Sequence, residues 1–273
     1  MTIIVERAEP DVVRIRMSSW RGRAVGYDVS AFLLRGVLVD TGFPGARDEL
    51  LAAVLPLAPR GVVVTHWHED HAGNAAALAA LGVPVRMHPR CEATLRTQPA
   101  IRLYRRVVWS QAPRLEAPLV SFDPAPLLVI DTPGHSGDHQ VVWDPERRIL
   151  ASGDLFLGVK VRVAHLHEMP SLVLQSLRRT ISLQPRILLD AHRGVVANAT
   201  EMLQAKVDWM EETIEQIETL AREGAGEREI AQRVLGREAF VGWVSGFEYS
   251  KRAFVRGVLR ESAGPSTRVV RSG

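Results

Sequence analysis

The segment His66-Trp67-His68-Glu69-Asp70-His71 places three imidazoles and two carboxylates in six residues, directly after the apolar run 61–64. Imidazole and carboxylate are ligands that zinc-like cations prefer in proteins, and a run this dense can supply two ions. The alternative is a polar surface loop, but histidine is a rare residue, and three at this spacing favour a ligand role. The chain must therefore fold so that further ligands reach the end of this apolar strand.

Three more segments place histidine or aspartate just after a predicted strand: 131–135, 152–154 and 190–192. Each alone is weak evidence, because histidines at strand ends commonly lie at the surface and aspartates there commonly form turns. Together they matter more, since the six-residue cluster cannot complete the coordination of two metal ions by itself. The pattern therefore favours a metal site built where several strands end.

The order of predicted elements indicates a mixed α/β fold. Strands are predicted at 2–7, 11–17, 25–34, 37–40, 61–64, 85–87, 127–131, 140–143, 149–152 and 186–189. Helices are predicted at 46–57, 74–81 and 171–183, with a mostly helical connection at 89–115 and a loop at 155–169. Beyond 199 the chain is helical, with apolar residues at three- and four-residue intervals over 200–222 and shorter helices at 227–235 and 249–261. We therefore expect a main domain, 1–198, and a C-terminal helical region, 199–273.

Composition excludes several other classes of protein. The 273 residues are 46% hydrophobic and 24% charged, which is ordinary for a globular chain. A net charge of +3 without a basic tail makes a nucleic-acid partner unlikely on charge grounds. The single cysteine, Cys91, excludes an internal disulfide, the first residues lack a signal-peptide pattern, and no apolar run is long enough to span a membrane. We expect a cytoplasmic protein that acts on a small molecule, with its oligomeric state left open.

In their order and spacing, the four ligand-bearing segments resemble the metallo-β-lactamase superfamily. His66-x-His68-x-Asp70-His71 matches its central motif, and His135, Asp154 and His192 match the three later ligand positions. Asp40-Thr41-Gly42 resembles an aspartate commonly found in the first half of that family. The resemblance spans about residues 25–195 and implies a four-layer αβ/βα sandwich with a dinuclear metal site where two similar halves meet.

The resemblance also implies a role for each ligand. His66, His68 and His135 would bind one metal ion, Asp70, His71 and His192 would bind a second, and Asp154 would bridge the two. Zn²⁺ is the simplest occupant, although the same ligands accept Fe or Mn. The ligand set is closer to the hydroxyacylglutathione hydrolase and lactonase branches than to the β-lactamases that use a cysteine ligand.

A dinuclear site of this kind predicts hydrolysis. Two divalent ions lower the pKa of bound water and polarise a carbonyl oxygen, which suits attack of a metal-bridging hydroxide on a small ester, thioester or lactone. Asp70 and Asp154 are then the catalytic carboxylates. The positive charge that remains would favour an anionic substrate.

Two other activities are compatible with the same ligands. A phosphodiesterase or ribonuclease would also use two metals, but an inserted nucleic-acid domain is missing and the positive charge is modest. A mononuclear iron oxidoreductase, similar to persulfide dioxygenases, would use His66, His135 and Asp154 and leave the other ligands partly idle.

Residues outside the motif supply candidate substrate contacts. The loop 155–169 follows the proposed bridging aspartate, so Arg162, His165 and His167 are candidates, with a solvated loop as the alternative. Tyr249 is a further candidate from the C-terminal helices, with a purely structural helix face as the alternative.

Two further features of the sequence have two interpretations each, and a third gives only a weak signal. The arginines of 102–106, with Tyr104 and Trp109, form either a pocket wall or the solvated basic face of a helix, which we favour. Asp40 either accepts a hydrogen bond from a ligand histidine or forms a turn. Glu69 is predicted to be a surface or structural residue.

Overall fold

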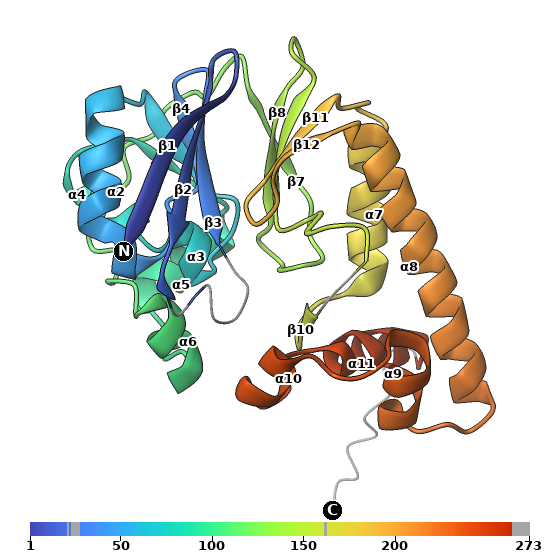
Figure 1. Ribbon diagram of the computed structural model, residues 1–273. Coiled ribbons are helices and arrows are strands. Elements are labelled where there is room, and N and C mark those ends of the chain that lie inside the picture. The colour runs from blue at the N-terminus through green and yellow to red at the C-terminus, as the bar shows by residue number, and fades with distance from the viewer. Residues whose placement is uncertain (21, 23–27, 161–162, 264–273) are drawn as a thin grey trace, which may run out of the picture.

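Two β-sheets face each other and form the centre of the molecule (Figure 1). The computed structural model describes residues 1–20, 22, 28–160 and 163–263. The first sheet has the order β1-β2-β3-β4-β5-β6, antiparallel from β1 to β4 and parallel from β4 to β6. Its strands are β1 Thr2–Glu9, β2 Val12–Ser18, β3 Val29–Leu34, β4 Val37–Val39, β5 Gly61–Val63 and β6 Val85–Arg86.

The second sheet comes from the other half of the chain and has the order β12-β11-β9-β8-β7. Only the β9–β11 pair is parallel, and the other pairs are antiparallel. A separate two-stranded ladder pairs β10 (Ala164–His165) with β13 (Tyr249–Ser250). The strands of the second sheet are β7 Leu128–Asp131, β8 Gln140–Asp144, β9 Ile149–Gly153, β11 Ile187–Asp190 and β12 Gly194–Ala197.

Helices cover the outer side of each sheet. In Figure 1, α2 (Arg47–Val54) and α4 (Ala75–Ala80) flank the first sheet, and α7 (Pro170–Ile181) and α8 (Ala199–Arg222) flank the second. The remaining helices gather at one end of the sandwich, where the ligand segments also lie. They are α3 Glu69–Ala72, α5 Pro89–Thr97, α6 Leu103–Trp109, α9 Glu227–Leu235, α10 Phe240–Val244 and α11 Lys251–Ser262, and 3₁₀ turns occupy Pro44–Ala46 and Leu55–Leu57.

Three hydrophobic clusters hold these layers together. The cluster between the two sheets includes Phe32, Val63, Val142 and Leu189, so the inner faces of both sheets are buried against each other. A second cluster joins the first sheet to its helices, and a third joins the second sheet to α7, α8 and α11. Because strands covered on both faces carry continuous apolar runs, the sequence could predict them. The four-layer αβ/βα sandwich is confirmed.

The structure adds elements that the sequence pattern did not predict, including α3, β10, β12, α10 and β13. Helix α8 shares the core of the second sheet through Leu203 and Val207, although the division at 198/199 stays a prediction. The start of the predicted strand 25–34 includes residues 25–27, which lie outside the described residues. Within the described part of the chain, no helix has the length and apolar character needed to cross a membrane.

Candidate metal centre and its pocket

The strand ends bring all seven predicted ligands together. His66 follows β5, Asp154 follows β9 and His192 follows β11, all at the same end of the sandwich. Their donor atoms form two groups, and the atoms within each group lie within 4.8 Å of one another. The first group is His66, His68, His135 and Asp154, and the second is Asp70, His71 and His192.

Asp154 lies between the two groups. Its Oδ2 is 3.3 Å from His135 Nε2 and 3.9 Å from His66 Nε2. Its Oδ1 is 3.1 Å from His71 Nε2 and 3.3 Å from His192 Nε2. Each oxygen of this carboxylate therefore faces a different group, which is the arrangement that a bridging ligand requires.

A glycine permits this position of Asp154. Gly153 has φ +49°, in the left-handed region that favours glycine, and a Cβ there would lie 2.8 Å from His139 Nε2 and 2.9 Å from Thr65 Oγ1. Any larger residue would push the Asp154 loop away from the end of β5. The close approach of the two halves at the site depends on this position.

Three ligand histidines are oriented by hydrogen bonds on the side of the ring away from the cluster. His71 Nδ1 is 2.8 Å from Asp40 Oδ2, His135 Nδ1 is 2.7 Å from Glu168 Oε1, and His192 Nδ1 is 3.0 Å from the carbonyl oxygen of Asp28. Because carboxylate and carbonyl oxygens only accept, each Nδ1 carries the proton in the neutral ring and each Nε2 presents a lone pair to the cluster. The contact with His71 confirms the hydrogen-bond interpretation of Asp40. Asp40 also accepts hydrogen bonds from the backbone N and the hydroxyl of Thr65, which hold its carboxylate in place.

The cluster consists of acceptors that cannot satisfy one another. His66 Nε2 and His135 Nε2 lie 3.0 and 3.1 Å from the same atom, His68 Nδ1, and neutral rings in these orientations supply too few protons for such contacts. Within the cluster, His71 Nε2 and Asp154 Oδ1 are buried without a hydrogen-bond partner, because a neutral His71 ring with its proton on Nδ1 offers no proton across the 3.1 Å between them. Bound cations would satisfy these atoms, so the residues present fit two divalent metal ions.

Burial and mutual charge shift the pKa values of these groups in opposite directions. Burial lowers the pKa of His66 and His68, and the neighbouring histidines lower it further. Burial also opposes protonation of His192, but Asp154 raises its pKa to about 9. Burial raises the pKa of Asp154, but His71 and His192 lower it well below its usual range. Protons and metal ions therefore compete for the second group.

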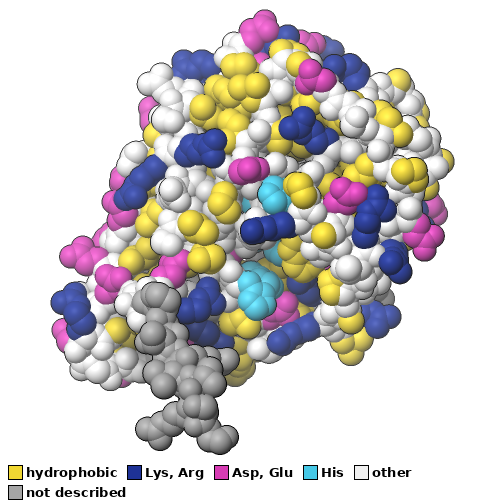
Figure 2. Space-filling view, turned by 180° about the vertical axis from the view of Figure 1, so that it is seen from behind, with side chains coloured by type: hydrophobic (Ala, Val, Ile, Leu, Met, Phe, Trp, Pro, Cys, Tyr) yellow, Lys and Arg dark blue, Asp and Glu magenta, His cyan; other side chains and the backbone are white. Residues whose placement is uncertain are grey.

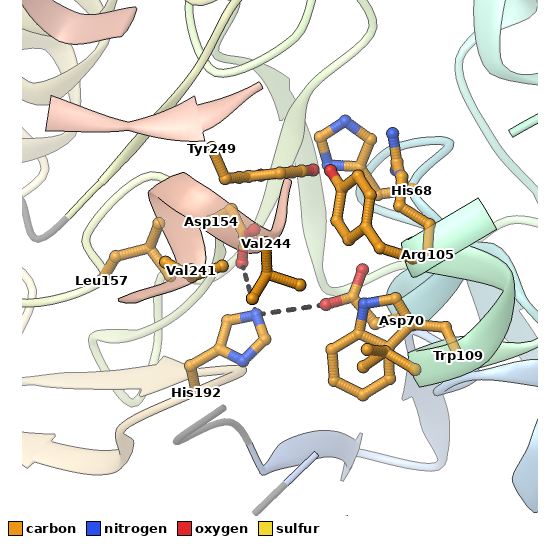
Figure 3. Close-up of a pocket in the computed structure, with 12 residues that line it drawn as sticks. His68, Asp70, Arg105, Trp109, Asp154, Leu157, His192, Val241, Val244 and Tyr249 are labelled. Atoms are coloured by element: carbon orange, nitrogen blue, oxygen red, sulfur yellow. Dashed lines mark ion pairs between the residues drawn. The ribbon is translucent and has the colours of Figure 1, made fainter. Parts of the chain in front are cut away.

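Four of the candidate ligands, His68, Asp70, Asp154 and His192, form the floor of a pocket whose walls are largely apolar (Figure 3). Helix α6 supplies one wall, and α10 with Tyr249 supplies the opposite one. Figure 2 shows histidine side chains in the middle of one face of the molecule, with basic and hydrophobic side chains around them. The pocket is lined by His68, Asp70, Tyr104, Arg105, Val108, Trp109, Asp154, Leu157, His192, Val241, Val244 and Tyr249.

A buried ion-pair network connects the metal-binding motif to the C-terminal region. Arg105 Nη2 lies 2.5 Å from Glu69 Oε2, and Arg105 Nη1 lies 3.4 Å from Glu248 Oε1. The guanidinium also lies 5.4 Å from the ring centroid of Trp67 and 5.7 Å from that of Tyr249. The favoured solvated-face interpretation is therefore wrong for Arg105, and Glu69 is a buried structural residue and not a surface one.

The structure places the candidate substrate contacts in different surroundings. Tyr249 lines the pocket. His165 is buried and does not lie in a solvated loop: its Nε2 is 3.2 Å from Glu248 Oε1, and its ring centroid is 5.5 Å from that of His68. His167 is exposed, lies next to His165 and is not part of the pocket lining, and Arg162 lies outside the described residues.

Several functional residues were missed by sequence reasoning. Glu168 orients His135 across 33 positions of the chain, and its only signal was that it ends the loop after Asp154. Leu157, Val241 and Val244 line the pocket, and aliphatic residues carry no sequence signal that separates a pocket wall from a core.

The hydrogen bond from His135 to Glu168 gives a testable prediction. Glu168→Gln should weaken metal binding about 10- to 100-fold, because the amide is a poorer partner for the ring N–H and makes the histidine a weaker ligand. Competition with a chelator of known affinity measures the change. Glu223→Gln, at the exposed end of α8, is the matched control and should leave metal affinity unchanged; equal affinities for the Glu168 variant and the wild type would contradict the role of Glu168.

Comparison with known proteins agrees with this geometry. The sequence profile of the metallo-beta-lactamase superfamily matches residues 25–208. The chain is 32% identical over 177 residues to an atrochrysone carboxyl ACP thioesterase of Aspergillus fumigatus, covering 63% of this chain and 51% of the relative. It is 30% identical over 127 residues to the probable metallo-hydrolase YybB of Bacillus subtilis, covering 45% and 58%. A solved metallo-beta-lactamase family protein from Thermus thermophilus superposes with a TM-score of 0.67 at 19% identity, covering 93% of this chain and 95% of that chain.

This chain belongs to the metallo-beta-lactamase superfamily, since the family profile covers more than half of it, including all seven ligand positions. The chain spans 51% to 65% of the length of three of the curated relatives it matches, and less of several others. The likeness to the solved structure shows a shared fold.

Proposed function

We propose that this protein is a metal-dependent hydrolase that holds two divalent cations and cleaves an ester, thioester or lactone. The observation that carries the proposal is the position of Asp154, whose two oxygens face the two separate groups of donors. Two of the relatives support it, because their names describe a thioesterase and a probable metallo-hydrolase.

The chain's own residues would hold and orient the metal ions. His66, His68 and His135 would hold one ion, Asp70, His71 and His192 the other, and Asp154 both. Bound ions of this kind lower the pKa of water and polarise a carbonyl oxygen. Zn²⁺ fits nitrogen and oxygen donors at this density, and Fe or Mn are the alternatives.

The pocket walls favour a carbonyl substrate over a phosphodiester. Among the described lining residues, Arg105 is the only arginine or lysine, and its guanidinium already faces two carboxylates. A phosphodiester or nucleic acid would bring negative charge into a pocket without a free cationic side chain. The charge of the metal ions led us to expect an anionic substrate, but the pocket walls provide no free cationic side chain that would bind one. The acyl group in the proposal is therefore neutral.

The decisive experiment measures metal content and activity on the same preparation. We expect two zinc ions per chain by elemental analysis, hydrolysis of thioester, ester or lactone substrates, loss of activity with a chelator and recovery with added Zn²⁺. Activity against bis(p-nitrophenyl) phosphate alone would instead support the phosphodiesterase. One iron per chain with oxygen consumption would overturn the proposal in favour of an oxidoreductase.

A further inference from the structure

Helices α6 and α10 each present apolar side chains both into the pocket and outward at its mouth. Inside the pocket they place Val108 and Trp109 opposite Val241 and Val244. Outside it, the same two helices expose Leu103, Val107 and Phe240, of which Leu103 is 74% and Phe240 is 71% exposed, whereas Trp243 lines a separate pocket with Phe247. The apolar lining therefore continues from the metal centre to the protein surface.

The charged groups beside this lining already form ion pairs with one another. Arg105 faces Glu69 and Glu248, and Arg102 Nε lies 2.9 Å from Glu248 Oε2. Glu248 also accepts from His165, so the network ties together α6, the β10 strand and the segment before β13. A substrate between α6 and α10 would thus meet mainly hydrocarbon and aromatic surface, and the polar groups of the walls are the hydroxyls of Tyr104 and Tyr249 and the ion-paired Arg105.

We propose that the acyl group of the substrate is long and apolar and lies between α6 and α10, with its far end on the exposed rim formed by Leu103, Val107 and Phe240. This inference rests on the proposed hydrolase function and adds the class of acyl group that the site selects. The occupant is the acyl group because the rim is continuous with the lining of the same pocket that contains the metal ligands.

Burial of apolar surface sets the size of the expected effect. Each methylene that leaves water for such a pocket improves binding about fourfold. We therefore expect kcat/KM for N-acetylcysteamine thioesters to rise by about this factor per carbon as the acyl group lengthens from two to about eight carbons. Calorimetric binding of the free fatty acids of the same lengths should give the same order without any turnover.

Two variants test which residues select the chain length. Val244→Asp places a charge on the pocket wall at a position that is 43% exposed, so the fold tolerates it. It should lower the octanoyl-to-acetyl ratio of kcat/KM at least about tenfold. Phe240→Ser on the rim should lower only the preference among the longest acyl groups. Leu81→Ser, which removes another exposed apolar side chain at the end of α4, is the control and should leave the ratio unchanged.

The outcomes separate the inference from the proposed function. Hydrolysis and fatty-acid binding that do not depend on chain length would overturn the inference and leave the hydrolase intact. Absence of hydrolysis of thioesters, esters and lactones alike, with chain-length-dependent binding of the fatty acids, would overturn the hydrolase and retain the apolar site. If light scattering shows that Phe240→Ser dissociates a dimer while the preference among the longest acyl groups is unchanged, the rim is a contact between two copies and the inference is wrong.

Discussion

Asp154→Ala is expected to lower kcat/KM by at least about a thousandfold and to reduce the metal content below two ions per chain. The reason is its place between both groups of donors, with Oδ1 3.1 Å from His71 Nε2 and Oδ2 3.3 Å from His135 Nε2. Removing this carboxylate would take a ligand from each ion and leave the charge of both less neutralised. Elemental analysis and steady-state kinetics on one preparation measure both effects.

The matched control is Asp48→Asn, which neutralises an exposed carboxylate in the first turn of α2, away from the site. It should leave both metal content and kcat/KM unchanged. Wild-type rates in the Asp154 variant would remove the bridging role from Asp154. Loss of one ion with retained activity would indicate that a single metal is enough for catalysis.

The second large effect is expected from Arg105→Met, which should lower the free energy of unfolding by about 3–5 kcal/mol. The variant leaves Glu69 buried opposite an apolar side chain and leaves Glu248 with its contacts to Arg102 and His165, so both carboxylates lose charge compensation for their burial. Burial already raises the pKa of Glu69 in spite of the nearby guanidinium. Urea unfolding monitored by tryptophan fluorescence measures the loss.

Arg106→Met is the control for this prediction, because Arg106 is the neighbouring exposed arginine on the same helix. It should change the free energy of unfolding by less than about 0.5 kcal/mol. A double-mutant cycle with Glu248→Gln should give a coupling energy between about 0.5 and 3 kcal/mol. Additive effects in that cycle, or equal effects of the two arginine variants, would show that the network contributes little.

The two groups of candidate metal ligands could be predicted from sequence because their signals are local. Each ligand follows an apolar strand, and the six-residue cluster contains four of the seven donors. The sandwich was predictable for a related reason: strands buried on both faces read as apolar runs, and α8 has a regular apolar stripe.

The rest depends on pairings that no local pattern encodes. The β10–β13 ladder joins Ala164 to Ser250, and two-residue strands have no periodicity to detect. In the sequence, Arg105 cannot be distinguished from the exposed arginines of its helix. Its burial depends on Glu69 and Glu248, which come from two distant segments of the chain. The basic pattern of α6 therefore concealed one buried residue among exposed ones.

The division of the pocket along the chain has a consequence for engineering. The seven metal-site residues all precede position 193, whereas Val241, Val244 and Tyr249 come from a short segment near the end of the chain. Substrate range can therefore be diversified in a library restricted to 240–249 without altering a single donor atom. Glu248 must be held constant in such a library, because it is the anchor that fixes this segment to Arg105 and His165.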